Sequence, residues 1–85
     1  MEFIYTKKFA KELSKFPKEI KNKTRERLVI FSLNENDSVL NNHKLNPPWE
    51  GYRSINVTGD IRIIYRKDKI FWILCRIGTH PQLYS

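Results

Sequence analysis

Three β-type runs that follow one another with almost no spacer determine what the C-terminal half of this chain can fold into. They span residues 52–57, 61–66 and 70–77 and are rich in isoleucine and aromatic residues. Only residues 58–60 and 67–69 separate them, and connections this short join neighbouring antiparallel strands. The sequence therefore predicts a three-stranded antiparallel meander.

The N-terminal part predicts a short strand and a helical hairpin. Residues 2–5 are rich in aromatic and β-branched types, and Thr6 can cap the helix that follows. Apolar side chains then recur at intervals of three and four over residues 7–16, the spacing of one helix face. Pro17 ends this helix, and the same spacing continues in a second helix to about Leu33.

Residues 34–48 have the composition of a loop, with five Asn, one Asp, one Ser and two Pro. A chain of 85 residues is long enough for one core and too short for a second. We therefore expect a single α+β domain over residues 1–85. The N-terminal strand and the two-helix hairpin should pack on one face of an antiparallel sheet and leave the other face open for a ligand.

The net charge of +7 indicates a negatively charged partner, because such a field attracts phosphate polyanions. RNA, the ribosome or an acidic protein would each fit. Lys44, Arg53 and Arg66 are the side chains that we expect to contact RNA. A single cysteine, Cys75, and the lack of an apolar run of membrane-spanning length favour a cytoplasmic protein without a membrane partner.

Two arginines in the predicted strands are candidates for binding a phosphate. Alternation along residues 61–66 places Ile61 and Ile63 on one face of the sheet and Arg62 on the other. Arg76 lies near the end of the last strand. If both arginines share the open face, they form a two-guanidinium clamp suited to a phosphate. Surface salt bridges, or side chains that extend past the sheet edge, are the alternative.

His80 is the strongest candidate for a general base. Pro81 follows it and biases it toward an extended conformation in a terminal segment rather than a helix. A surface or capping role is the alternative for a single histidine.

Three further residues have an ordinary structural role as the alternative to a functional one. His43 lies in the predicted loop and could hydrogen-bond to the backbone. Asp60 could orient His43, balance Arg62 or simply form the turn. Tyr84 could stack on a base or anchor the C-terminus. The sequence has no zinc spacing, carboxylate cluster or glycine-rich phosphate loop, so RNA cleavage without a metal or another cofactor is expected.

The second half of the chain resembles the YafQ branch of the RelE toxin superfamily. The most specific part is the Arg-x-Gly-Thr-His ending with an aromatic residue four positions later. The matching segments are His43-Lys-Leu, Trp49-Glu-Gly-Tyr-Arg53, Gly59-Asp60-Ile-Arg62-Ile-Ile-Tyr65 and Arg76-Ile-Gly-Thr-His80-Pro-Gln-Leu-Tyr84.

The resemblance implies a role for each matched residue. His80 takes the place of the family's principal catalytic histidine, and Arg76 that of its C-terminal strand arginine. His43, Asp60 and Tyr84 match the loop histidine, the turn aspartate and the terminal aromatic residue.

One further position matches RelE-type relatives, and two depart from the YafQ pattern. Arg62 matches an arginine of RelE-type relatives. Asn56 stands where the YafQ branch has a second histidine, and Ile61 stands where it has a tryptophan.

The function that this resemblance implies is that of the toxin in a type II toxin-antitoxin pair. Such a toxin is a ribosome-dependent endoribonuclease that cuts messenger RNA in the ribosomal A site by 2′-hydroxyl attack, and a cognate antitoxin neutralises it. Three alternatives remain open: a ParE-like toxin that poisons gyrase, a non-catalytic module that binds RNA or the ribosome, and a toxin that has lost activity.

Overall fold

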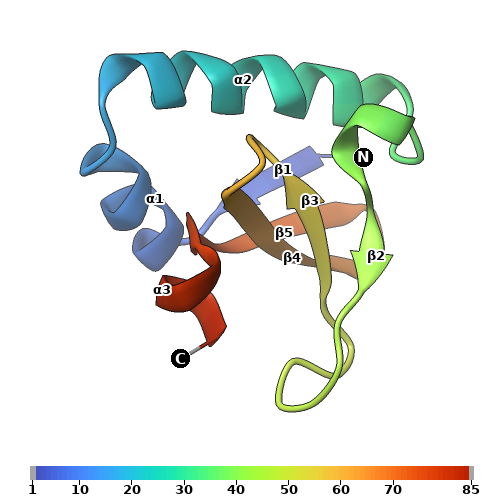
Figure 1. The fold of residues 1–85 in the computed structure, drawn as a ribbon. Helices are drawn as coiled ribbons and strands as arrows, with labels where there is room; N and C mark the ends of the chain where they lie inside the picture. The colour runs from blue at the N-terminus through green and yellow to red at the C-terminus, as the bar shows by residue number, and fades with distance from the viewer. Residues whose placement is uncertain (1, 85) are drawn as a thin grey trace.

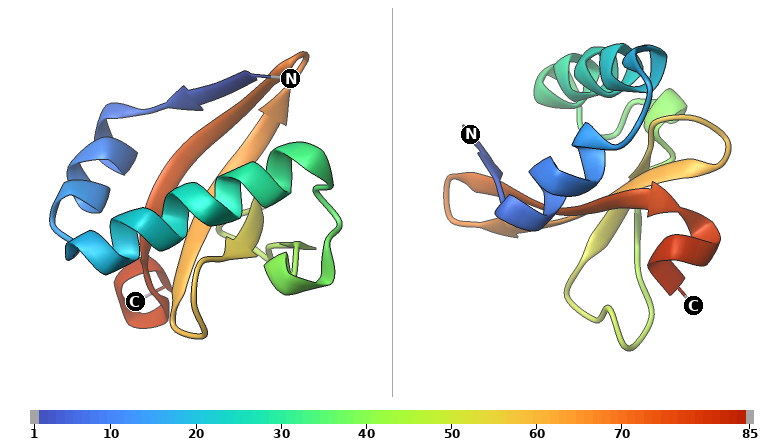
Figure 2. Two further views of the ribbon diagram at one scale, coloured as in Figure 1. Left: turned by 90° about the horizontal axis from the view of Figure 1, so that it is seen from above. Right: turned by 90° about the vertical axis from the view of Figure 1, so that its left-hand side faces the viewer.

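The computed structural model describes residues 2–84, which form two helices over one face of a five-stranded sheet (Figure 1). A third, short helix and the segment after β2 lie on the other side of the sheet (Figure 2). The elements in chain order are β1 (Glu2–Tyr5), α1 (Lys7–Ser14), α2 (Lys18–Leu33), the 3-10 helix η1 (Ser38–Leu40), β2 (His43–Lys44), β3 (Arg53–Asn56), β4 (Ile61–Asp68), β5 (Phe71–Thr79) and α3 (His80–Tyr84).

The sheet has the order β1-β5-β4-β3-β2. The predicted meander is confirmed, since β3, β4 and β5 are sequential antiparallel neighbours. β2 adds to β3 antiparallel, whereas β1 pairs with β5 in parallel. The expected antiparallel sheet therefore holds for four strands. A tight hairpin joins only antiparallel strands, whereas the long connection between β1 and β5 permits β1 to run in either direction.

The helical hairpin forms where its spacing and caps predict it. Thr6 Oγ1 accepts a hydrogen bond from the Phe9 backbone N–H at 3.2 Å and donates to the Leu74 carbonyl at 2.8 Å, so the cap also ties α1 to β5. α1 ends at Ser14, two residues before the predicted end, and α2 begins directly after Pro17.

The core lies between the two long helices and the sheet. Phe31 of α2 packs edge-on against Trp72 and Tyr65, with ring centroids 4.6 and 4.9 Å apart. Ile61 and Ile63 are both buried in this core, which confirms the face predicted for them.

Two predictions about local structure are wrong. Residues 34–48 contain η1 and β2 in addition to loop. His80 begins a helix instead of an extended segment, because Pro81 occupies the first turn, where its missing N–H has no partner to lose. Thr79 and Gln82 form a capping box: Gln82 Oε1 accepts from Thr79 N at 2.8 Å, and Thr79 Oγ1 accepts from Gln82 N at 3.4 Å.

Within residues 2–84, every helix is too short or too polar to cross a membrane.

Candidate active site

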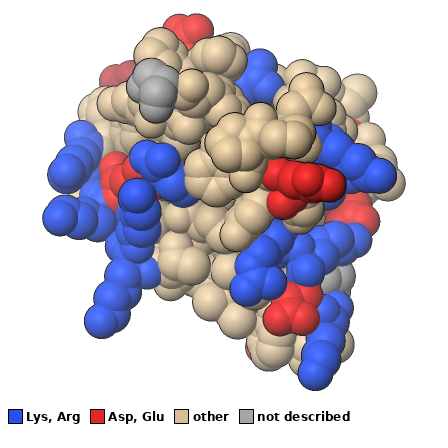
Figure 3. Space-filling model, turned by 90° about the horizontal axis from the view of Figure 1, so that it is seen from below, with Lys and Arg blue, Asp and Glu red and all other residues tan. Residues whose placement is uncertain are grey.

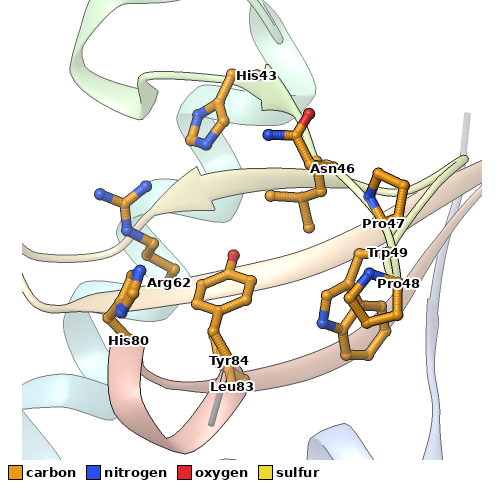
Figure 4. Close-up of a pocket in the computed structure, with 10 residues that line it drawn as sticks. His43, Asn46, Pro47, Pro48, Trp49, Arg62, His80, Leu83 and Tyr84 are labelled. Atoms are coloured by element: carbon orange, nitrogen blue, oxygen red, sulfur yellow. The ribbon is translucent and has the colours of Figure 1, made fainter.

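A pocket of about 530 Å³ is lined in part by α3 and the segment after β2. Both lie on the side of the sheet that α1 and α2 leave free (Figure 2). β4, α3 and the segment that includes β2 and the residues after it each contribute to its walls (Figure 4). The lining residues are His43, Leu45, Asn46, Pro47, Pro48, Trp49, Arg62, His80, Leu83 and Tyr84.

Strand register explains why Arg62 reaches this pocket. Arg62 is the cross-strand partner of Asn56 on β3 and of Gly78 on β5. Cross-strand partners share one face, and the core-facing neighbours Ile61 and Ile63 occupy the other. The predicted outward position of Arg62 is therefore confirmed.

His80, Arg62 and His43 come from three different elements and line the same pocket, around the ring of Tyr84 (Figure 4). His80 and Tyr84 lie one helical turn apart on α3, and their ring centroids are 4.6 Å apart with an interplanar angle of 51°. His80 is exposed, whereas Arg62, His43 and Tyr84 are half-buried. The Tyr84 hydroxyl is shielded from solvent and has no hydrogen-bond partner among residues 2–84.

A backbone carbonyl orients the imidazole of His43. Its Nδ1 lies 2.8 Å from the carbonyl oxygen of Asn41. Because a carbonyl can only accept, Nδ1 carries the proton, and in the neutral ring Nε2 is left as the acceptor. The nitrogen that remains for a ligand is thus Nε2.

Asn42 anchors the backbone beside His43, a role that sequence reasoning missed. Its Nδ2 donates to the Tyr65 hydroxyl at 2.8 Å and to the Glu35 carbonyl at 2.9 Å, and its Oδ1 accepts from Arg53 Nε at 2.9 Å. Burial raises the pKa of Tyr65 and favours the protonated phenol in this network. One Asn among several in this segment gave no sequence signal for this role.

Arg76 does not join the pocket that contains Arg62. Its Nη2 and Nε donate to Glu12 Oε2 at 2.6 and 3.1 Å, and Glu12 Oε1 accepts from the Ile77 backbone N–H at 3.2 Å. Arg76 lines a separate groove, which Gln82 of α3 also borders. The expected two-guanidinium clamp is therefore absent from this conformation, because a carboxylate on α1 holds one of its arginines.

Asp60 serves the turn between β3 and β4. Its backbone N–H donates to Thr58 Oγ1 at 3.2 Å, and the next N–H, that of Ile61, donates to the same oxygen at 3.0 Å. Asp60 is exposed and outside the pocket, and within the described chain its carboxylate makes no ion pair with Arg62 or His43.

The three other basic candidates lie away from the pocket. Lys44 and Arg53 are cross-strand partners and line a neighbouring groove of about 500 Å³ together with Lys67. Leu45 borders both this groove and the pocket. Arg66 pairs loosely with Asp68, at 3.9 Å.

The face that carries α3 and the segment after β2 is basic at its margins (Figure 3). Lys and Arg side chains gather in two groups there, with a stretch of uncharged surface between them (Figure 3). A polyanion would therefore meet positive charge on both sides of this stretch. Within residues 2–84 there is no group of three His, Cys, Asp or Glu side chains placed to hold a metal ion.

Comparison with known proteins shows that this fold is that of a toxin of a type II toxin-antitoxin system. A family model described as the bacterial toxin of type II toxin-antitoxin system, YafQ, matches residues 1–85. The chain belongs to the YafQ toxin family.

Solved structures agree with this assignment. YafQ from E. coli BL21(DE3) superposes with a TM-score of 0.84 at 25% identity, covering 98% of this chain and 97% of that one. YafQ in the E. coli DinJ-YafQ complex gives 0.77 at 26% identity, covering 98% and 96%. A YoeB/ParE toxin from Agrobacterium tumefaciens shares the fold, with a TM-score of 0.79 at 14% identity over 94% and 99% of the two chains. No curated protein sequence matches the chain.

Proposed function

We propose that this toxin is an endoribonuclease that cuts messenger RNA in the ribosomal A site without a metal ion. The observation that carries the proposal is the meeting of His80, His43 and Arg62 around one open pocket. Two imidazoles can move protons on opposite sides of a phosphate, and a guanidinium can bind the phosphate between them.

His80 acts as the general base in this scheme. It is the first residue of α3 and is exposed, so its ring can reach a ribose 2′-hydroxyl at the pocket mouth. His80 takes the 2′-proton while the 2′-oxygen forms a bond to phosphorus. Arg62 stabilises the charge that builds up on the pentacovalent phosphorus, where preorganised donors contribute most.

His43 is the proposed acid. The bond from phosphorus to the 5′-oxygen breaks, and that oxygen receives a proton from Nε2 of a doubly protonated His43. The contact with the Asn41 carbonyl is compatible with this form, since Nδ1 donates to that carbonyl whether or not Nε2 carries a proton. The products are a 2′,3′-cyclic phosphate and a 5′-hydroxyl.

Arg76 and Asp60 have lesser roles here than the resemblance implies. Arg76 would reach the scissile phosphate only by exchanging Glu12 for it, so in the observed conformation Arg76 supports the strand end that leads into α3. Asp60 lies outside the pocket in which the reaction is proposed to take place. Lys44, Arg53 and Arg66 would bind RNA or ribosomal phosphates outside the pocket, and Tyr84 would stack against a base.

A cognate antitoxin is the proposed protein partner. E. coli YafQ, 26% identical to this chain, is found in complex with DinJ. The net charge of +7 would suit an acidic antitoxin segment as well as RNA.

The test is primer extension on a messenger RNA under translation in a purified system, with wild-type toxin beside His80→Ala. We expect cuts within codons that disappear with the variant. Uncut RNA with both proteins would overturn the proposal and direct attention to gyrase or to binding without cleavage.

A further inference from the structure

The pocket has two chemically different ends, and the proposed cleavage uses only one of them. Arg62 and the two histidines form the polar end, whereas Pro47, Pro48 and Trp49 form the other (Figure 4). Tyr84 lies between the ends (Figure 4). The pocket volume of about 530 Å³ is that of a site for an entire small molecule, a class that spans roughly 300–1,000 Å³. A phosphate at the polar end would leave the apolar end empty.

The apolar end belongs to a segment that its own hydrogen bonds hold in shape. The Asn46 carbonyl accepts from Trp49 N at 2.9 Å, and the Trp49 carbonyl accepts from Tyr52 N at 3.0 Å. Leu45 N in turn donates to the Tyr52 carbonyl at 3.0 Å, which closes the loop. The surface is thus organised before any ligand arrives, which lowers the entropy lost on binding.

Trp49 is directed inward even though the segment around it is exposed. It is half-buried, while Asn46, Pro47, Pro48 and Glu50 are all exposed. Tyr52 packs against its indole in an edge-on arrangement with ring centroids 5.2 Å apart and an interplanar angle of 81°. An indole held in this way at a pocket wall is a rigid flat surface of low entropy cost.

We propose that the apolar end binds a nucleobase adjacent to the scissile phosphate, with Trp49 as its main stacking platform and Tyr84 as its boundary toward the reacting groups. This inference rests on the proposed RNA substrate. In a nucleotide, a sugar joins an anionic phosphate to a flat base that can stack on an aromatic ring. The pocket presents matching groups in the same order: Arg62 for the phosphate, Tyr84 beside the sugar and Trp49 for the base. Stacking accepts any base, and the Asn46 amide at the rim offers one donor and one acceptor edge to discriminate among them.

The first experiment measures binding without cleavage. A fluorescently labelled oligonucleotide with 2′-deoxyribose throughout has no attacking hydroxyl, so its anisotropy reports affinity alone. We expect Trp49→Ala to weaken binding about tenfold, the loss that fits one stacked base, and Trp49→Phe to stay within about threefold. Ile70→Ala is the matched control, because Ile70 is an apolar side chain, 61% exposed, that lies outside the pocket.

An abasic scan then tests whether Trp49 contacts a base. Removing the base next to the scissile position should weaken binding to wild-type toxin as much as Trp49→Ala does. The same removal should not weaken binding to the Trp49→Ala variant any further. Losses that multiply, or a Trp49→Ala affinity equal to wild type, would overturn the proposal. So would a variant that keeps its oligonucleotide affinity and loses affinity for an antitoxin peptide, since the apolar end would then bind protein.

The outcome separates this inference from the proposed nuclease function. Codon cuts that persist at unchanged positions in Trp49→Ala, with unchanged binding, would leave the nuclease and remove the base site. Uncut messenger RNA together with coupled losses in the abasic scan would remove the nuclease and leave a base-binding toxin. Circular dichroism of each variant confirms that the fold is intact, and Trp49→Phe preserves the ring packing on Tyr52.

Discussion

Glu12 on α1 holds the guanidinium of Arg76 on β5 through two donors, and both side chains are about 20% exposed. The same carboxylate accepts the backbone N–H of Ile77 at 3.2 Å. One residue of the first helix thereby fixes the strand end that leads into α3 and His80.

Glu12→Ala should destabilise the protein by about 2 kcal/mol, because it leaves a half-buried guanidinium and a backbone N–H without an acceptor. Urea unfolding measures this change. Glu26→Ala is the control, because Glu26 is 61% exposed and 3.8 Å from Lys23, a geometry typical of surface pairs that contribute little. Equal losses in the two variants would contradict the assigned role of Glu12.

Arg62→Ala should slow single-turnover cleavage on the ribosome by about 10²–10³-fold, the effect of removing one donor from a developing oxyanion. Arg62→Lys should recover only part of the rate, because an ammonium keeps the charge and loses the two-pronged geometry. Arg25→Ala, on the exposed side of α2, should cleave at the wild-type rate. A fully active Arg62→Ala toxin would remove this residue from the mechanism.

Asn42→Ala should act on cleavage through His43. The substitution leaves the Tyr65 hydroxyl and Arg53 Nε without their shared partner and frees the backbone beside the histidine. We expect Asn42→Ala to lower the cleavage rate of the otherwise wild-type toxin. In a toxin that already carries His43→Ala, it should lower the rate no further, which a double-mutant cycle measures. Independent effects would mean that Asn42 serves stability alone.

Oligonucleotide binding should weaken steeply as salt rises, since each phosphate contact releases counterions. Lys44→Ala should reduce the slope of log affinity against log salt by about one. Lys23→Ala, on α2 at the other side of the sheet, should leave the slope unchanged. If both substitutions reduce the slope equally, the oligonucleotide is attracted by the net charge of the whole protein and does not bind specifically along the groove that Lys44 lines.

The thiol of Cys75 should react slowly with a disulfide reagent near pH 8. Burial raises its pKa above the ordinary value of 9.0, so the thiolate fraction at this pH is smaller than that of a free thiol. Raising the pH toward 10 should accelerate the reaction. Unfolding in guanidinium should bring the rate at pH 8 to that of a free thiol. A native rate equal to the unfolded rate would contradict this assignment.

The sequence predicted the elements that local patterns determine. Two short turns required the meander, and alternation along β4 placed Arg62 on the open face. The same reasoning did not place the Arg76 side chain, because Glu12 of α1, 64 residues away in the sequence, draws it into a separate groove, and no local pattern signals that contact.

Other features depended on contacts between distant segments. β2 is only two residues long and exists through its pairing with β3. The parallel direction of β1 has no local signal. α3 did have one, since Thr79 and Gln82 stand at the spacing of a capping box, but the extended preference expected before Pro81 outweighed it in the prediction.

The segment from Leu45 to Tyr52 closes mainly on itself, through hydrogen bonds between its own backbone groups, while the residues of the polar end of the pocket come from β2, β4 and α3. Substitutions at its exposed positions therefore carry little penalty for the sheet. In evolutionary terms, the proposed function would let drift in one surface loop change which transcripts are cut, while the residues proposed for the chemistry stay where they are.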